Sequence, residues 1–217
     1  MHLRVDRVSG PDSPVLDAAD SADRPESAGD LIERIRAQAV FWPPITGAFC
    51  SLAANTVGTP NPTPGGLASQ YSAPGHYVLD NDDEAMVIEF GAGDAGYVGI
   101  QLGSRQFISI DYRDRITSLN PAQLRADADG RFRVVISRKD PGVANWLDPG
   151  PHPEGIIFMR WQAMASELPS ADHPTAAVVP RHRVRDRADA GGRCTEEQRR
   201  VQIHARSASL APRGDHT

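Results

Sequence analysis

Short stretches in which apolar and polar residues alternate constrain the fold of this chain more than any other feature. Met86, Ile88 and Phe90 form one such stretch between Val87 and Glu89. The same spacing recurs in Val98, Ile100 and Leu102, in Ile108 and Ile110, in Phe132, Val134 and Ile136, and over residues 156–161. Successive side chains of a strand point to opposite faces, so this period of two predicts half-buried strands.

Turns, and not helices, separate these predicted strands. Asp127-Ala-Asp-Gly130 is typical of a hairpin turn leading into the strand at 131–137. Short strands joined by tight turns favour an antiparallel sheet over alternating β–α units. We therefore expect a mainly β protein: an antiparallel β-sandwich or jelly-roll-like domain, with one helix before it and one after it.

Composition divides the 217 residues into five segments. These are a disordered acidic tail (1–28), an N-terminal helix (29–54), a Pro/Gly-rich loop (55–75), a β domain (76–162) and a C-terminal extension (163–217) with a helix at about 196–210. The tail is too rich in Asp, Ser and Pro to bury enough apolar surface to offset its ordering entropy. Thr195 and Gln198 form a capping-box pattern at the start of the last helix, and Ala176–Val179 are predicted to add an edge strand.

The N-terminal helix is predicted to begin at Asp30, with Glu33 completing a capping-box-like pair, and to end at Pro43-Pro44. Its apolar stripe consists of Leu31, Ile35, Ala39 and Trp42. Residues at this spacing share one face of a helix, and we expect that face to dock on the sheet. The Pro/Gly-rich loop that follows has two interpretations, a lid and a loosely attached connector.

Charge and cysteine content exclude few classes of partner. The net charge of −5 is mild, and the arginine-rich run at 181–187 has no interleaved aromatic residues, so nucleic-acid binding is not predicted. Cys50 and Cys194 lie far apart without a CxxC motif, which favours a reducing cytoplasm. No run is long enough to span a bilayer, and the first residues lack the apolar core of a signal peptide.

The loop Asp140–Asp148 lies between two turn signals, Asp140-Pro-Gly142 and Pro149-Gly150-Pro151. Trp146 inside it is expected to be a buried anchor, which places Asn145 and Asp148 at a boundary with solvent. Such polar residues form either the rim of a binding site or the caps of a structural loop.

Several ordered sequence blocks resemble the DUF1214 family. They are 109–120, 129–137, 140–148, His152, Glu154-Gly155 and Arg160-Trp161, with a weaker similarity at 195–199. The resemblance covers roughly residues 75–162 and implies a mainly antiparallel β-sandwich with no assigned function. The chain departs from the family pattern at Pro121-Ala122, where relatives carry Gly-His, and at Pro149-Gly150-Pro151, where they carry Thr-Ala-Gly.

Candidate functional residues come from these blocks. The candidate catalytic residues are Asp111, Asp148 and His152, and the candidate ligand-binding residues are Tyr112, Arg115, Asn120, Asp140, Asn145, Trp146 and Arg160. No metal site is predicted, because no HExxH-like spacing occurs, and no cofactor is expected.

Three hypotheses of function remain. The favoured one is a β-sandwich module that binds a small polar or carbohydrate-like ligand beside aromatic faces. The second is a hydrolase or lyase in which Asp111 or Asp148 acts with His152. The third is a purely structural or interaction module, in which Asp111 pairs with a nearby arginine. Oligomeric state is left open.

Overall fold

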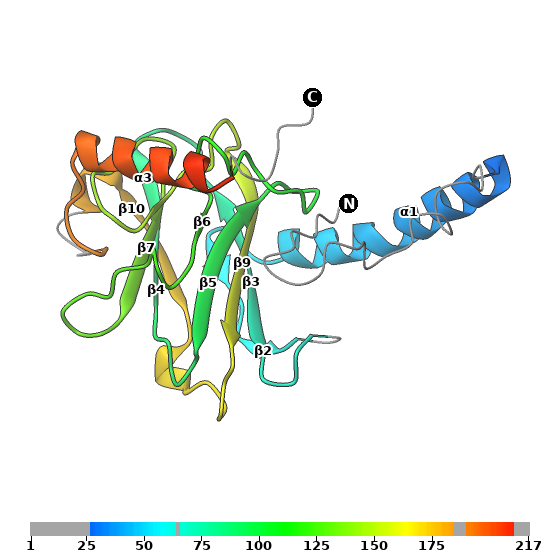
Figure 1. The fold of residues 1–217 in the computed structure, drawn as a ribbon, viewed down its shortest axis with the longest axis horizontal. Coiled ribbons are helices and arrows are strands. Elements are labelled where there is room, and N and C mark those ends of the chain that lie inside the picture. Colours follow the sequence, from blue (N-terminus) through cyan, green and yellow to red (C-terminus); the bar gives the residue numbers. More distant parts are fainter. Residues whose placement is uncertain (1–26, 64–65, 185–189, 211–217) are drawn as a thin grey trace, which may run out of the picture.

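Two β-sheets packed face to face make up the protein, with a helix at each end of the chain described (Figure 1). The computed structural model describes residues 27–63, 66–184 and 190–210. The first sheet has the strand order β1–β3–β9–β5–β6, with β2 also paired to β3, and the second has the order β10–β4–β7–β8. All strand pairs are antiparallel except β7 with β8. The predicted mainly β sandwich with two flanking helices is confirmed.

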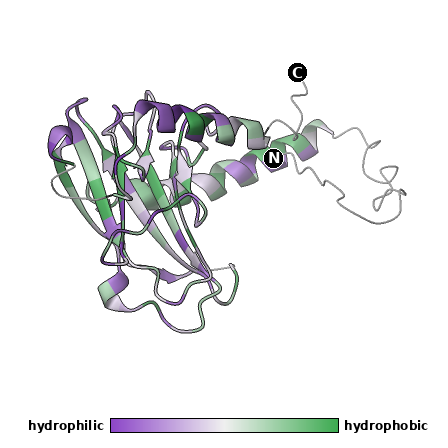
Figure 2. Cartoon of the chain, turned by 60° about the vertical axis from the view of Figure 1, so that its left-hand side comes forward, coloured by the Kyte–Doolittle hydropathy of each residue, from purple (hydrophilic) through white to green (hydrophobic). Residues whose placement is uncertain are grey.

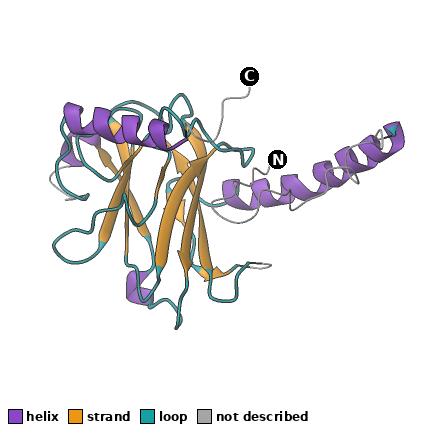
Figure 3. Ribbon diagram, in the orientation of Figure 1, coloured by secondary structure: helices purple, strands orange, loops and turns teal. Residues whose placement is uncertain are grey.

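Figure 3 shows where the helices lie relative to the sheets. The first sheet contains β1 (Thr56–Val57), β2 (Asn61–Pro62), β3 (Tyr71–Val78), β5 (Tyr97–Gly103), β6 (Ser118–Leu119) and β9 (Glu154–Gln162). The second contains β4 (Glu84–Phe90), β7 (Phe132–Ile136), β8 (Trp146–Leu147) and β10 (Thr175–Pro180). The helices are α1 (Ala28–Cys50), α3 (Glu196–Leu210) and two 3₁₀ turns, η2 (Ser170–Asp172) and η3 (Arg181–Arg183). None of the helices in these described ranges is long and apolar enough to cross a membrane.

The core lies between the sheets and consists of the inward-facing residues of the long strands (Figure 2). Met86, Ile88 and Phe90 of β4 are fully buried, as the period of two predicts. Trp161 of β9 meets Phe90 edge to face at 6.0 Å, and its indole N–H donates to the Gly91 carbonyl at 2.9 Å. Burying one such large side chain stabilises the fold by about 1.5–3 kcal/mol. The core residues together therefore supply much of the free energy that holds the two sheets against each other.

Helix α1 begins and ends elsewhere than predicted. Ser27 is the N-cap: its hydroxyl accepts the Asp30 N–H at 3.1 Å, and the Asp30 carboxylate accepts the Ser27 N–H at 3.1 Å. Asp30 is thus the third helical residue of a capping box and not the cap itself. The predicted end at Pro43-Pro44 is also wrong, because the helix continues to Cys50. The carbonyl groups that lose their N–H partners at these prolines lie on an exposed part of the helix, where water can bind them.

The apolar stripe of α1 docks only at its C-terminal end. Phe49 is 7 % exposed and packs against Phe107 at 5.2 Å, and Trp42 stacks on the same ring at 5.9 Å. Leu31 and Ile35 remain exposed where the helix projects beyond the sheets (Figure 1). The prediction that the whole stripe docks on the sheet is therefore wrong, because the helix is longer than the surface it meets.

The segment predicted to be a Pro/Gly-rich loop contains two short strands and the start of a long one. β1 pairs with β3 at 75–76, and β2 pairs with it at 71–72. Pro74 of β3 falls between these two partners, so its missing N–H costs no ladder hydrogen bond on that side. Proline in this segment is therefore compatible with strand structure at a sheet edge.

The predicted strand at 106–112 is wrong, because the chain turns there. The Ser104 hydroxyl accepts the N–H groups of Gln106 and Ile108 at 3.2 and 3.3 Å, and Phe107 has a φ of +61°. Ile108 is consequently 64 % exposed whereas Ile110 is 4 % exposed, so the two do not share a face. Local hydrogen bonds from the serine compete with pairing along this stretch.

The C-terminal region agrees with the sequence more closely. Thr195 and Gln198 exchange hydrogen bonds of 3.2 and 2.8 Å at the start of α3, which confirms the capping box. β10 pairs with β4 as the predicted edge strand. The tail predicted to be disordered spans residues 1–28: residues 27 and 28 are instead the N-cap and first residue of α1, and residues 1–26 lie outside the described residues, as do the arginines at 185 and 187.

Candidate functional site

The loop Asp140–Asp148 is built as a structural unit. Trp146 is 6 % exposed, and its indole N–H donates to the Ser137 carbonyl at 3.0 Å. Asn145 is fully buried: its amide nitrogen donates to the carbonyls of Arg125 and Arg133 at 2.7 and 3.0 Å, and its oxygen accepts the Arg125 N–H at 2.9 Å. The Asn145 side chain therefore joins neighbouring segments of backbone and does not present itself to a ligand.

The acidic candidates have local partners. Asp111 accepts the N–H groups of Arg113 and Asp114, both at 3.1 Å, and so caps its own turn. Asp148 accepts the Gly150 N–H at 2.7 Å and forms an ion pair with Arg115 at 2.8 Å. Each carboxylate is held by its own loop, and among the described contacts none brings Asp111 and Asp148 together as an acid–base pair.

Asp140 holds helix α3 to the sandwich. Its carboxylate accepts the Gly142 N–H at 2.7 Å and pairs with the Arg199 guanidinium at 2.9 Å. Arg199 is 5 % exposed and lies over the Trp146 ring at 4.7 Å. A buried guanidinium with a carboxylate, a carbonyl and an aromatic face is fully satisfied, so this contact stabilises the fold.

His152 and Arg160 lie apart from that loop unit. His152 is half-buried between two prolines, and within the described ranges only its backbone N–H has a hydrogen bond, to the Pro149 carbonyl at 3.2 Å. Arg160 is exposed on the outer face of β9, with its guanidinium 4.5 Å from the centre of the Phe158 ring. Residues described by the structure contain no group of three or more His, Cys, Asp or Glu side chains that could hold a metal ion.

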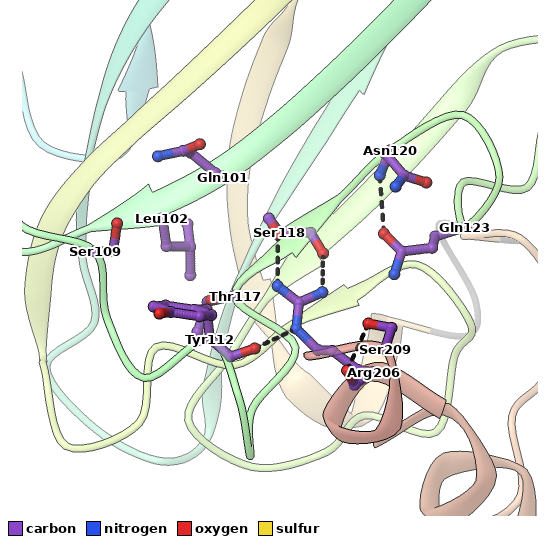
Figure 4. Close-up of a pocket in the computed structure, with 10 residues that line it drawn as sticks. All are labelled: Gln101, Leu102, Ser109, Tyr112, Thr117, Ser118, Asn120, Gln123, Arg206 and Ser209. Carbon is purple, nitrogen blue, oxygen red and sulfur yellow. Dashed lines mark hydrogen bonds between the residues drawn. The ribbon is translucent and has the colours of Figure 1, made fainter. Parts of the chain in front are cut away.

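A polar pocket lies on the outer face of the first sheet, at the edge formed by β5 and β6, with α3 along one side (Figure 4). Its volume is about 320 Å³, at the lower end of the range of about 300–1,000 Å³ for small-molecule sites. The lining residues are Gln101, Leu102, Ser109, Tyr112, Thr117, Ser118, Asn120, Gln123, Arg206 and Ser209. Of the candidates named from the sequence, Tyr112 and Asn120 are among them.

The Arg206 side chain enters this pocket from α3. Its three nitrogens donate to the Tyr112 carbonyl at 2.6 Å, the Ser118 carbonyl at 3.1 Å and the Ser118 hydroxyl at 2.6 Å (Figure 4). All three acceptors are neutral. Burial lowers the pKa of Arg206 because desolvation disfavours the charged form.

The loop after β6 orients two amide side chains at the rim of the pocket. The Asn120 side-chain oxygen accepts the Ala122 N–H at 3.0 Å, and the Gln123 side-chain oxygen accepts the Asn120 N–H at 3.1 Å. Since a backbone N–H can only donate, these bonds fix the oxygen end of each amide. The NH₂ ends remain as donors at the pocket.

Two further cavities adjoin this pocket and share residues with it. One, of about 160 Å³, shares Gln101, Ser118 and Asn120, and brings in Arg160 with Tyr97. The other, of about 430 Å³, extends beneath α3 and includes Arg125. The three cavities share lining residues and together form one groove, which we call the Arg206 groove; its part beneath α3 also has apolar lining residues, including Ile116 and Leu119.

Sequence reasoning missed Gln101, Gln123 and Arg206. Gln101 is an outward-facing position of a predicted strand, and Arg206 is one of several arginines on a predicted helix. Contact between residues 206 and 118, 88 positions apart, depends on where α3 crosses the sheet, and the sequence contains no signal for that crossing.

Comparison with known proteins supports the fold and does not give a function. No protein-family model and no curated protein sequence matches the chain. The chain is similar to an uncharacterized protein from Burkholderia cenocepacia, with a TM-score of 0.53 and 30 % identity over 59 % of this chain and 36 % of that protein. It also aligns with the VPA0106 protein from Vibrio parahaemolyticus at a TM-score of 0.41 and 18 % identity, over 51 % of this chain and 31 % of that one. The chain thus spans about a third of the length of either solved structure.

Proposed function

We propose that this protein is a β-sandwich module that binds a small polar ligand in the Arg206 groove. The observation that supports the proposal is the convergence of uncharged hydrogen-bonding side chains and arginine on one concave surface. Small-molecule sites place a few oriented polar groups in a concavity of this size. Three residues selected from the sequence, Tyr112, Asn120 and Arg160, line the groove, and the tyrosine ring offers an aromatic face.

The hydrolase or lyase alternative has weaker support. An acid–base mechanism needs carboxyl groups within reach of one substrate. Asp111 and Asp148 are instead bound to the backbone of separate turns, and Asp148 is paired with Arg115. We therefore favour ligand binding over catalysis.

Two further assignments accompany this proposal. The ordered blocks between residues 109 and 161 support membership of the DUF1214 family as a divergent member. Free thiols at Cys50 and Cys194 support a reducing, cytoplasmic location, which fractionation of cells producing the tagged chain would test.

The binding proposal is tested with a variant that fills the groove without changing its charge. Gln101 is exposed on the outer face of β5, so Gln101→Trp should obstruct the groove and leave the core intact. Ala177→Trp, at an exposed position on the edge strand of the other sheet, is the matched control. A library of small polar compounds is screened against the wild type by ligand-observed NMR. Compounds that bind should lose binding to Gln101→Trp and keep it for Ala177→Trp; equal binding to all three proteins would refute the assignment of the site.

A further inference from the structure

We propose that the ligand of the Arg206 groove is a small organic anion whose carboxylate or phosphate group lies against Arg206. This inference rests on the proposed function and names the chemical class of the ligand. Its basis is the balance of charge and of hydrogen-bond donors in the groove.

Within the part of the chain that the structure describes, Arg206 differs from the other well-packed arginines in having no acidic partner. Arg131, Arg133 and Arg199 each contact at least one carboxylate at 3.0 Å or less. Arg206 has only neutral acceptors among the described residues, and they take three of its five N–H donors. A half-buried guanidinium without a counter-ion is electrostatically unsatisfied, and a bound oxyanion would supply both the opposite charge and a further acceptor.

The amide groups beside Arg206 also favour an anionic ligand. Asn120 and Gln123 use their side-chain oxygens within the loop, so each offers its NH₂ group as a donor. Among the described residues, neither NH₂ group has a hydrogen bond. The site therefore presents an excess of donors, which suits a ligand that is rich in acceptors.

The charge of the groove as a whole supports the same class of ligand. Arg125 and Arg160 line the two adjoining cavities, and among the described residues no Asp or Glu lines any of the three. The chain carries 28 acidic and 23 basic residues. A basic groove on a protein of net negative charge concentrates anions near the site.

The experiment compares sugars that share the glucose ring and differ in the group attached to it at C5, which is charged in two of them and neutral in the third. Binding of glucuronate, glucose 6-phosphate and glucose to the full chain is measured by ligand-observed NMR and calorimetry. The acyclic pair succinate and succinamide repeats the comparison without a sugar ring. We expect at least one charged compound to bind about tenfold or more tightly than its neutral counterpart, which is the scale of one hydrogen bond to a charged group. The glucuronate and glucose 6-phosphate arms show whether the group is a carboxylate or a phosphate.

Two variants separate charge from architecture. Gln123→Glu keeps the oxygen that accepts the Asn120 N–H and replaces the donor end with a negative charge, so the fold should be retained. It should weaken the charged probes by about tenfold or more and weaken the neutral probes less, because the loss of the donor affects both classes whereas the added negative charge repels only the anions. Arg206→Gln should abolish the preference for charge, whereas Arg200→Gln on the exposed side of the same helix should preserve it.

Each outcome decides the proposal. Preference for a charged probe that is lost in Gln123→Glu and Arg206→Gln supports it. Equal binding of charged and neutral probes, or a Gln123→Glu variant that keeps the preference for charged probes, refutes the proposal that the ligand is an anion. In that case the groove remains a candidate site for a neutral ligand. If no charged probe binds at millimolar concentration, the proposal that the ligand is an anion is refuted. The proposed ligand-binding function is refuted as well only if no compound in the wider library of polar compounds binds.

Discussion

Replacing Trp146 with alanine tests whether the Asp140–Asp148 loop anchors the fold or serves a ligand. A tryptophan buries up to about 250 Å², and Trp146 is only 6 % exposed. At about 25 cal/mol per Å² this corresponds to about 6 kcal/mol as an upper bound, which falls by 10–40 % when the unfolded chain is taken as partly compact. We therefore expect Trp146→Ala to lower the free energy of unfolding by about 4 kcal/mol, within the range of about 3–5 kcal/mol for large core aromatics.

The assay is urea denaturation followed by far-UV circular dichroism, because tryptophan fluorescence is altered by the substitution itself. For a chain of this size the loss corresponds to a fall in melting temperature of about 8–16 °C. Trp42→Ala is the matched control: Trp42 is 41 % exposed, and its ring contacts are to Phe107 at the rim of the sandwich and to Phe41 of its own helix. It should cost less than about 1 kcal/mol. A Trp146→Ala protein within about 1 kcal/mol of the wild type, or equal losses for both variants, would refute the reasoning.

Two further substitutions probe the packing around Tyr77 in the first sheet. The Tyr77 hydroxyl is buried without a hydrogen-bond partner among the described residues, so Tyr77→Phe should leave the free energy of unfolding unchanged or raise it by up to about 1 kcal/mol. Burial, followed by the charges of Glu154 and Asp148, raises the pKa of Tyr77 above its ordinary 10.0. Because the raised pKa belongs to the folded state, its contribution to stability is complete below pH 10 and is lost as the pH rises above that value. In a series of melting curves at different pH values, Tyr77→Phe should show a smaller loss of stability above pH 10 than the wild type. Gly155→Ala would place a methyl group against the Gly103 carbonyl and the Tyr77 hydroxyl, so it should cost at least about 2 kcal/mol, and a protein as stable as wild type would show that β9 and β5 can separate there.

Four of the long strands, β4, β5, β7 and β9, were predictable from their alternating or apolar residues, whereas most of β3 lies in the segment that was predicted to be a loop. In β4, β5 and β9 most residues of the predicted apolar face are buried. In β7 both faces are buried at the end of the strand, with Val134 and Ile136 in the main core and Val135 in a second cluster. Ile108 and Ile110 have the same period and form no strand, because Ser104 supplies competing hydrogen bonds. Periodicity therefore predicts strands where tertiary burial reinforces it and fails where local hydrogen bonds are stronger.

The groove was predictable only in part. Tyr112, Asn120 and Arg160 were selected as polar or aromatic residues within the family-like blocks, and they do line it. Gln123 and Arg206 acquire their roles from a loop conformation and from the packing of a helix against a distant strand. Neither can be read from residue type or spacing, since both depend on which surfaces meet after folding.

Helix α3 is attached to the sandwich mainly through guanidinium groups. Arg199 is its one fully buried residue, and Arg206 reaches across to Ser118. Ion pairs on the surface weaken as ionic strength rises, whereas buried and partly buried contacts are screened much less. The docking of α3 through Arg199 and Arg206 should therefore change little with salt concentration. Because α3 forms one wall of the groove, ligand binding in the groove and docking of the helix on the sandwich are thermodynamically linked. Each process favours the other by the same free energy.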